Sequence, residues 1–229
     1  MESLVKFLAR AGSFPRRQAE ALIREGRIRV NGAPALSPSL QVGPGDRVFL
    51  DGHPLSAETI KVYIALNKPD GYISDLKDVR GRKLARDLIK HDLRLFPVGR
   101  LDYHSEGLMI LTNDGELANH VMHPRYNVTK EYLVKFKGLL PGEAVTRMKK
   151  GMFVEGELYQ AESVRLARKA PANVWYSIVV NEGKNRMIRK MGAALGHPVL
   201  KLRRVRIGKL RLGDLKPGEY RHVERNEII

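Results

Sequence analysis

The most informative part of the chain is residues 99–115, which read GRLDYHSEGLMILTNDG. Arg100 and Asp102 stand two residues apart, directly before an apolar run that predicts a strand at 107–112. Because alternate side chains of an extended segment point the same way, we expect both charges to face one cleft. A carboxylate at the mouth of a strand is a candidate base or nucleophile. For a lone Asp, however, capping a turn before the strand is the commoner role.

The charge of the chain restricts its class of partner. The 229 residues include 41 Lys and Arg against 25 Asp and Glu, a formal net charge of +16. Such an excess raises the local concentration of polyanions, which favours nucleic acid or an anionic membrane as partner. No apolar stretch is long enough to span a bilayer, and the first residues lack the apolar run of a signal peptide. Without Cys, disulfides and thiolate metal sites are excluded, and we expect a cytoplasmic protein with no membrane partner.

Residues 1–58 are predicted to form a small domain of helices followed by strands. Apolar residues recur at three-and-four spacing in the first part, and glycines stand where helices would end. Residues 52–58 are polar, contain a proline and show no period, so we place a linker there. The expected elements are a helix over 4–11 ended by Gly12, a helix from Pro15 to Gly26, and strands at 28–30 and 47–50.

Residues 59–229 are predicted to form a second, larger domain. Its strands and helices are mixed without strict alternation, and no glycine-rich nucleotide loop is present. This pattern favours an α+β fold with a mainly antiparallel mixed sheet flanked by helices. The expected strands are 62–66, 107–112, 131–137, 173–180 and 199–207, and the expected helices are 84–90, 115–122, 141–150 and 185–195.

Two basic segments are candidate contacts for RNA. Arginine pairs with phosphate through two hydrogen bonds at a time, whereas lysine acts as a point charge. In the small domain the alternative is a solvated basic surface, but the segment carries arginines and no lysine. Residues 184–211 hold ten basic residues and no acidic one, so we expect the RNA backbone to cross there. The candidates are Arg16, Arg17, Arg24, Arg27 and Arg29 in the first segment, and Arg203, Arg204 and Arg206 in the second.

Residues 15–32, PRRQAEALIREGRIRVNG, resemble the alpha-L RNA-binding module of the S4 type, which is named after a small-subunit ribosomal protein. The chain has Pro15 where that module usually has Ser, so the helix start is capped differently. The resemblance implies docking onto structured RNA. The module occurs on several kinds of protein and does not by itself indicate an enzyme.

The 99–115 segment resembles the signature of pseudouridine synthases, in the branch that modifies ribosomal RNA and carries an S4-type module. Three further segments fit the same family, namely LNKPDGY at 66–72, KEY at 130–132 and EGKNRMIRKM at 182–191. Taken singly, these segments could be an ordinary strand end, a strand aromatic and a solvated helix face. The resemblance implies catalytic roles for Asp102, for Tyr132 stacked on the uracil and for Arg189 paired with Asp102. It implies substrate contacts for Arg100, Lys68, Ile188 and Arg186.

The reaction implied by the resemblance breaks the bond between uracil nitrogen and ribose, turns the base and rejoins it through carbon five. It needs no redox cofactor, nucleoside triphosphate or metal, so we expect none. The uridine must be flipped into a pocket, because it is unreachable inside folded RNA. We expect the partner to be ribosomal RNA, with 23S favoured over 16S, either as a stem-loop or in an assembling ribosomal subunit. We also expect the protein to be a monomer.

Two other function classes explain less of the sequence. A non-catalytic, ribosome-associated RNA-binding protein would explain the charge and the small domain, but not residues 99–115. A hydrolase based on Ser105 is excluded because Tyr103 breaks the Gly-x-Ser-x-Gly elbow. His120 and His123 have the spacing of two metal ligands, but a third ligand is missing nearby, so no metal site is expected.

Overall fold

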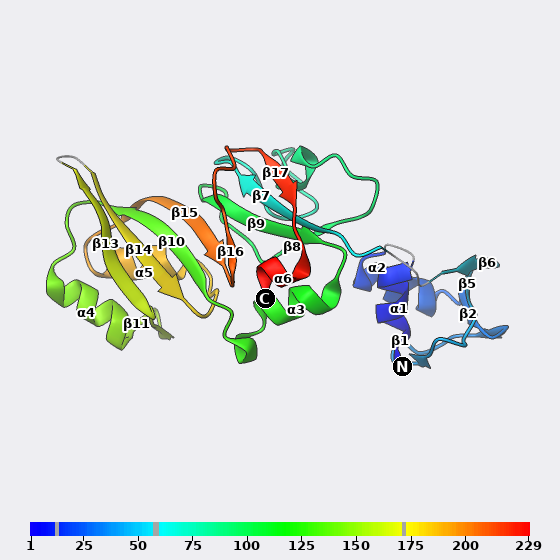
Figure 1. Cartoon of the computed structure of the whole chain (residues 1–229). Coiled ribbons are helices and arrows are strands. Elements are labelled where there is room, and N and C mark those ends of the chain that lie inside the picture. The colour runs from blue at the N-terminus through cyan, green and yellow to red at the C-terminus, as the bar shows by residue number, and fades with distance from the viewer. Residues whose placement is uncertain (12–13, 57–59, 171–172) are drawn as a thin grey trace. The chain divides into compact units, whose positions relative to one another are not determined.

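The computed structural model describes residues 1–11, 14–56, 60–170 and 173–229 (Figure 1). The chain divides into two compact units, Met1–Lys61 with Asp92–Arg94, and Val62–His91 with Leu95–Ile229. The predicted boundary between residues 58 and 59 lies outside the described residues, and so does Gly12, the predicted end of the first helix. Within the described ranges, no helix is both long enough and apolar enough to cross a membrane.

The smaller unit packs two helices on short strands. Its helices are α1 (Leu4–Ala11) and α2 (Arg16–Arg24), close to the predicted ranges, although Pro15 precedes α2 as its N-cap. Leu4, Leu8 and Ile23 are fully buried between them, which is the apolar face that the spacing predicts. The strands are β1 (Glu2–Ser3) with β4 (Gln41–Val42), and a sheet in the order β3 (Ala33–Pro34), β2 (Ile28–Val30), β5 (Val48–Leu50) and β6 (His53–Leu55).

The larger unit is built on one mixed sheet that is mainly antiparallel, as predicted. Among the neighbouring strands described, the parallel pair is β9 with β15, and the other pairs are antiparallel. The strand order along the sheet is β13 (Ser163–Ala170), β14 (Asn173–Val180), β10 (Lys130–Phe136), β15 (Val199–Ile207), β9 (Glu106–Thr112), β7 (Tyr63–Lys68) and β17 (Tyr220–His222); β16 (Leu210–Arg211) pairs with β15 and β8 (Phe96–Val98) with β9.

Helices pack on this sheet (Figure 1). They contribute side chains to two hydrophobic clusters. One cluster surrounds β10 and β14, where α4 packs on β13 and α5 on β15. The other surrounds β7 and β9, and α3 and α6 supply Leu117 and Ile228 to it. The elements are α3 (Gly115–Met122), α4 (Gly142–Lys150), α5 (Met187–Ala194), α6 (Arg225–Ile228), the 3₁₀ helices η1 (Ala85–Leu88) and η2 (Pro124–Tyr126), and the hairpin of β11 (Met152–Val154) and β12 (Glu157–Tyr159).

Several parts of the sequence prediction were wrong. The linker predicted at residues 52–58 contains β6, which pairs with β5 in the sheet of the smaller unit. The helix predicted at 84–90 is only the 3₁₀ turn η1, because the backbone of Lys83 and Ala85 hydrogen-bonds with Ile73 in an extended arrangement. The strand β13 was missed, because it lies at the edge of the sheet and has an exposed Leu166 and several basic side chains in place of a buried apolar run. Charged side chains are common on edge strands, where they discourage pairing with another chain.

The two antiparallel halves of the sheet meet at the parallel contact between β9 and β15. Arg203 and Arg204 of β15 pair there with Glu106 and Gly107 of β9. Gly107 has a φ of +103°, and a Cβ at this position would run into the backbone N and O of Arg204. Glycine therefore meets two requirements at once, an unusual backbone angle and a close approach of two main chains.

We predict that Gly107→Ala destabilises the protein by about 2–4 kcal/mol, because backbone strain and a backbone clash add. Gly115→Ala is the matched control, since a Cβ there meets open space at the first residue of α3. Chemical denaturation of both variants measures the difference. Equal unfolding midpoints for the two variants would show that the β9–β15 contact tolerates a side chain.

Candidate active site

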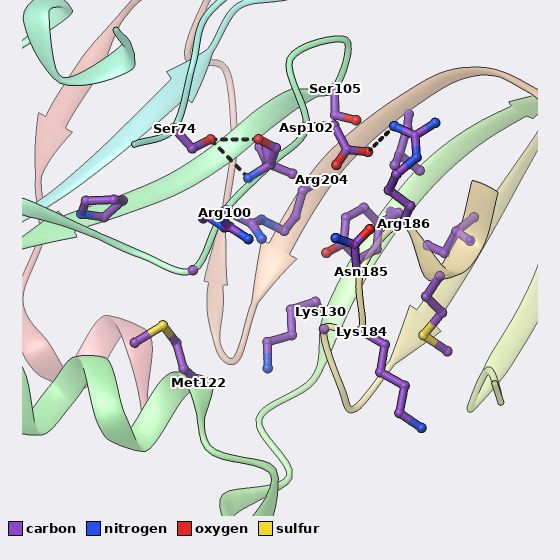
Figure 2. A pocket seen from close by; sticks show the side chains of 18 of the residues that line it. Ser74, Arg100, Asp102, Ser105, Met122, Lys130, Lys184, Asn185, Arg186 and Arg204 are labelled. Atoms are coloured by element: carbon purple, nitrogen blue, oxygen red, sulfur yellow. Dashed lines mark hydrogen bonds and ion pairs between the residues drawn. The ribbon is translucent and has the colours of Figure 1, made fainter. Parts of the chain in front are cut away.

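The larger unit contains a pocket of about 960 Å³ (Figure 2). Its wall comes from the segment before β9, from β10 and β15, from the end of α3 and from the segment that leads into α5. Segments from 73 to 207 thus meet around one cavity. The residues predicted from the sequence that line it are Arg100, Asp102, Tyr132, Arg186, Ile188 and Arg204.

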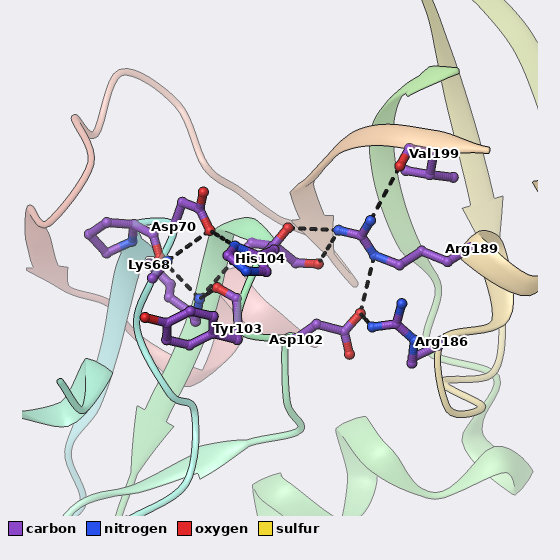
Figure 3. Close-up of polar contacts among 11 residues, drawn as sticks. Lys68, Asp70, Asp102, Tyr103, His104, Arg186, Arg189 and Val199 are labelled. Atoms are coloured by element: carbon purple, nitrogen blue, oxygen red, sulfur yellow. Dashed lines mark hydrogen bonds and ion pairs between the residues drawn. The ribbon is translucent and has the colours of Figure 1, made fainter. Parts of the chain in front are cut away.

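Asp102 lies at one side of this pocket and is held by two arginines (Figures 2 and 3). Its Oδ2 atom is 3.3 Å from Arg189 Nε and 3.5 Å from Arg186 Nη1. The Asp102 side chain is 31% exposed, so it can be reached from the pocket. The structure therefore brings together the Asp and the Arg that stand 87 positions apart in the sequence.

Arg189 links α5 to the segment that carries Asp102. Its Nη2 atom donates to the carbonyl oxygen of His104 at 2.6 Å and to Ser105 Oγ at 3.1 Å, and Nη1 donates to the Val199 carbonyl (Figure 3). Burial lowers the pKa of this guanidinium, and the charge of Asp102 opposes that effect. An arginine remains charged in either case. Arg189 therefore acts as a fixed cation that connects α5 to Asp102 and to the backbone after it.

Lys68 lies outside the wall of the pocket, which corrects the predicted substrate contact. Its side chain is fully buried, and Nζ donates to the carbonyl oxygens of Pro69, Tyr103 and Ser105 at 3.0, 3.4 and 2.8 Å (Figure 3). These contacts use all three donors of an ammonium group. Lys68 therefore holds the backbone on both sides of His104 and fixes the segment that follows Asp102.

Ser74 holds the same segment from the other side and was missed by sequence reasoning. Its buried hydroxyl donates to the Leu101 carbonyl at 2.8 Å and accepts from the Leu101 amide at 3.0 Å (Figure 2). This pair of bonds fixes the residue before Asp102. A serine between Ile73 and Asp75 carries no sequence signal for such a role, because the contact spans 27 positions.

Apolar side chains form another part of the wall. Tyr132 on β10 and Ile188 in the first turn of α5 are both more than nine-tenths buried and both line the pocket. Tyr132 is paired across the strands with Arg204 of β15. A flat aromatic surface and an aliphatic surface in one pocket suit the two faces of a planar base.

Arg100 and Arg186 lie at the exposed part of the pocket. Arg100 is about two-thirds exposed, and its Nη1 atom is 3.7 Å from Asp75 Oδ1. Arg186 precedes α5 with a φ of +52°, a conformation that few residues other than glycine adopt. Both guanidinium groups remain accessible to a ligand at the mouth of the pocket.

The arginines predicted to bind RNA fall into two groups. Arg16 and Arg17 are exposed, without an ion pair to any described residue, whereas Arg27 pairs with Asp51 and Glu25. Arg24 pairs with Glu20 at 3.7 Å, and Arg29 donates to the Gly32 carbonyl while staying exposed. Arg24, Arg27 and Arg29 therefore contact groups of the small unit itself. Of these five arginines, Arg16 and Arg17 are the two that are exposed and make no ion pair or side-chain hydrogen bond with a described residue.

On β15 the prediction of a surface contact is wrong for Arg204. Its side chain is buried and Nε donates to the Leu108 carbonyl at 2.7 Å. Arg206 binds Glu131 at 3.0 Å and Thr129 Oγ1 at 2.9 Å, so its guanidinium is held by the sheet. Arg203 remains partly exposed. The alternation of a strand explains the difference, because successive side chains enter opposite faces of the sheet.

Comparison with known proteins agrees with this architecture. Residues 62–194 match the family described as RNA pseudouridylate synthase, and residues 2–48 match the S4 domain. The chain is 43% identical to the "Uncharacterized RNA pseudouridine synthase" of Aquifex aeolicus (strain VF5), over 97% of this chain and 90% of that protein. It is 38% identical to "Ribosomal large subunit pseudouridine synthase B" of Bacillus subtilis (strain 168), over 100% of this chain and 94% of that protein.

A solved structure gives the same result for the fold. The "Crystal structure of pseudouridylate synthase" superposes with a TM-score of 0.69 at 29% identity, covering 99% of this chain and 98% of that one. The chain therefore belongs to the RNA pseudouridylate synthase family, with an S4 domain at its N-terminal side. It is an isomerase that acts on RNA, as the resemblance of residues 99–115 implied.

The buried ammonium of Lys68 gives a pH-dependent prediction. Burial lowers its pKa from 10.5 to about 8, so between these pH values the unfolded chain binds more protons than the folded chain. The free energy of unfolding should therefore rise with pH across this window, by about 3 kcal/mol relative to a Lys68→Met variant. Denaturation at pH 7, 8, 9 and 10 measures this, with the exposed Lys150→Met as control. Parallel pH profiles for wild type and Lys68→Met would contradict the burial of a charged Lys68.

Proposed function

We propose that this protein converts a uridine of 23S ribosomal RNA to pseudouridine and that Asp102 is its catalytic carboxylate. The observation that carries the proposal is Asp102 itself, an accessible carboxylate held by two arginines in a pocket that also contains Tyr132. The choice of 23S RNA is supported by the Bacillus subtilis relative, which is named a ribosomal large subunit enzyme.

The role of Asp102 is to act on the ribose of the target nucleotide. Either it attacks the carbon that carries the base, or it removes a proton from the neighbouring carbon. Both routes need a carboxylate in a fixed position. Arg189 and Arg186 bind one of its oxygens, while Lys68 and Ser74 hold the backbone on either side of it.

The target base reaches this carboxylate by flipping out of the RNA. Flipping costs a few kcal/mol of stacking, and stacking on an aromatic ring can return roughly 1–3 kcal/mol. We assign that ring to Tyr132 and the opposite apolar surface to Ile188, since both line the pocket. Arg100 and Arg186 at its mouth are suited to bind phosphates next to the flipped nucleotide.

Residues 1–58 serve, in this proposal, as a separate RNA-docking domain, and residues 59–229 carry the reaction. The match of residues 2–48 to the S4 domain supports this division. Arg16 and Arg17 are the side chains of the small unit best placed to meet phosphate, because they are exposed and have no ion-pair partner among the described residues.

We predict that Asp102→Asn abolishes pseudouridine formation and leaves RNA affinity nearly unchanged, because size is kept and the reactive charge is lost. The substrates are unmodified 23S and 16S transcripts, and pseudouridine is counted at each position after reaction. Asp214→Asn is the matched control, since Asp214 is exposed and outside the pocket. Appreciable turnover by Asp102→Asn would remove Asp102 from the catalytic role. Modification of 16S alone would overturn the choice of RNA.

A second prediction concerns the small domain. Replacing Arg16 and Arg17 together by Gln should weaken RNA binding and make the plot of log affinity against log salt shallower by roughly 1–2, because phosphate contacts release counterions. Arg27→Gln should change this slope less, since Arg27 is already paired with Asp51. Filter binding between 50 and 300 mM salt measures all three slopes. An unchanged slope for the double variant would place the RNA elsewhere.

A further inference from the structure

The pocket contains two buried cations to which no role has yet been given. Lys130 and Arg204 are 9% and 4% exposed, and both line the cavity. No carboxylate in the described part of the chain lies within ion-pair distance of either. Other cations of the pocket wall have such partners: Arg100 with Asp75, Lys184 with Glu182, and Arg186 with Asp102.

Backbone carbonyls satisfy these two side chains only in part. Lys130 Nζ donates to the Val121 carbonyl at 3.0 Å, in the last turn of α3. Arg204 Nε donates to the Leu108 carbonyl, whereas its Nη2 atom is buried and has no hydrogen-bond partner in the described structure. Each side chain therefore keeps donors that are not used within the protein. Figure 2 shows both side chains among the residues that line the pocket.

The strand register places both cations next to Tyr132. Lys130 is two residues before Tyr132 on β10, on the same buried face, and Arg204 is its partner across the strands. A base stacked on Tyr132 would therefore have a cation on each of two sides. Burial and, to a smaller extent, the positive charge of Arg204 lower the pKa of Lys130 to about 8.

Two buried charges without a carboxylate are unfavourable in the resting protein, unless an anion arrives. A phosphate of the RNA would bring a permanent charge. The base, in contrast, becomes negative only while it is detached from the ribose. The register that pairs Arg204 with Tyr132, together with the burial of both cations, favours the base.

We propose that Lys130 and Arg204 stabilise the negative charge on the uracil while its bond to the ribose is broken. This inference rests on the proposed reaction and on the stacking of the base on Tyr132. It makes the two side chains catalytic groups that contact the reacting base. Preorganised charges in a buried site are effective where charge develops in a transition state.

The electrons balance in either route open to Asp102. Cleavage of the bond between N1 and C1′ leaves both electrons on the uracil, which becomes a monoanion with charge shared by N1, O2 and O4. Asp102 meanwhile forms a bond to C1′ or takes a proton from C2′. Carbon five of the turned base then bonds to C1′, and the carboxylate leaves or returns its proton to C2′. The C5 proton departs and N1 takes one up, so the product is an isomer of the substrate.

The decisive variant is Lys130→Gln, whose amide can still donate to Val121 but carries no charge. At saturating RNA we expect its single-turnover rate to fall by about 10²-fold, the size seen when one charge-stabilising donor is removed. The dissociation constant for RNA should stay within about twofold of wild type, because the uracil is neutral when it binds. Lys130→Arg, which keeps the charge, should recover much of the rate.

Lys135→Gln is the matched control, because Lys135 lies on the same strand β10 but on the opposite face of the sheet. It removes the same charge and should leave the rate unchanged. Arg204→Lys should retain more activity than Arg204→Met, because lysine keeps the positive charge and methionine removes it. A normal rate for Lys130→Gln overturns the proposal. Weaker RNA binding with an unchanged rate at saturation also overturns it and assigns the two cations to a phosphate.

A second measurement is independent of how much of a variant is folded. RNA with 5-fluorouridine at the target position yields a more stable base anion, because fluorine withdraws electrons. Loss of intact 5-fluorouridine after digestion reports the bond cleavage. The ratio of Lys130→Gln to wild-type rates should be closer to 1 with this RNA than with uridine. Equal ratios for the two substrates overturn the inference, while absence of isomerisation by wild type on uridine overturns the proposed function itself.

Discussion

The close contact between the backbones of Gly107 and Arg204 is the constraint on which the site depends. It joins an antiparallel half that contains β10 and β15 to another that contains β7 and β9. Asp102 lies five residues before Gly107, and Tyr132 pairs with Arg204, so both are positioned by this one junction. A side chain at position 107 would push the strands apart and separate the carboxylate from the aromatic ring.

The carboxylate is fixed mainly through the backbone that carries it. Ser74 binds Leu101, while Lys68 and Arg189 bind carbonyls of residues 103–105, so contacts bracket Asp102 on both sides. The holding groups are more deeply buried than Asp102 itself. This arrangement allows a side chain to be open to a substrate and still keep a defined position, which favours reaction through preorganisation.

The sequence predicted those parts of the fold that depend on local pattern. The apolar run of β9 and the periodic helices α1 and α3 were found because their burial follows strand and helix spacing. The edge strand β13 was missed, since its exposed side chains do not show that signal. The pairing of Asp102 with Arg189 came from the resemblance to a family, because no local rule connects positions so far apart.

Side-chain direction was harder to predict than residue type. Lys68 was assigned a substrate contact by the family resemblance, and Arg204 and Arg206 were assigned RNA contacts by their charge. In the structure each of the three donates to groups of the protein itself. A cation in a basic segment looks the same in sequence whether it faces solvent or a buried carbonyl. The roles of Ser74 and Lys130 depend on contacts with Leu101 and Val121, which only the folded chain reveals.

The two oxygens of the Asp102 carboxylate are not equivalent. Both arginines contact Oδ2, and no described residue binds Oδ1. The two oxygens therefore differ before any substrate binds. Oδ2 is held by the two arginines, while the lone pairs of Oδ1 are available to a substrate. In the proposed reaction, Oδ1 would therefore be the oxygen that acts on the ribose, while Oδ2 stays with the two arginines.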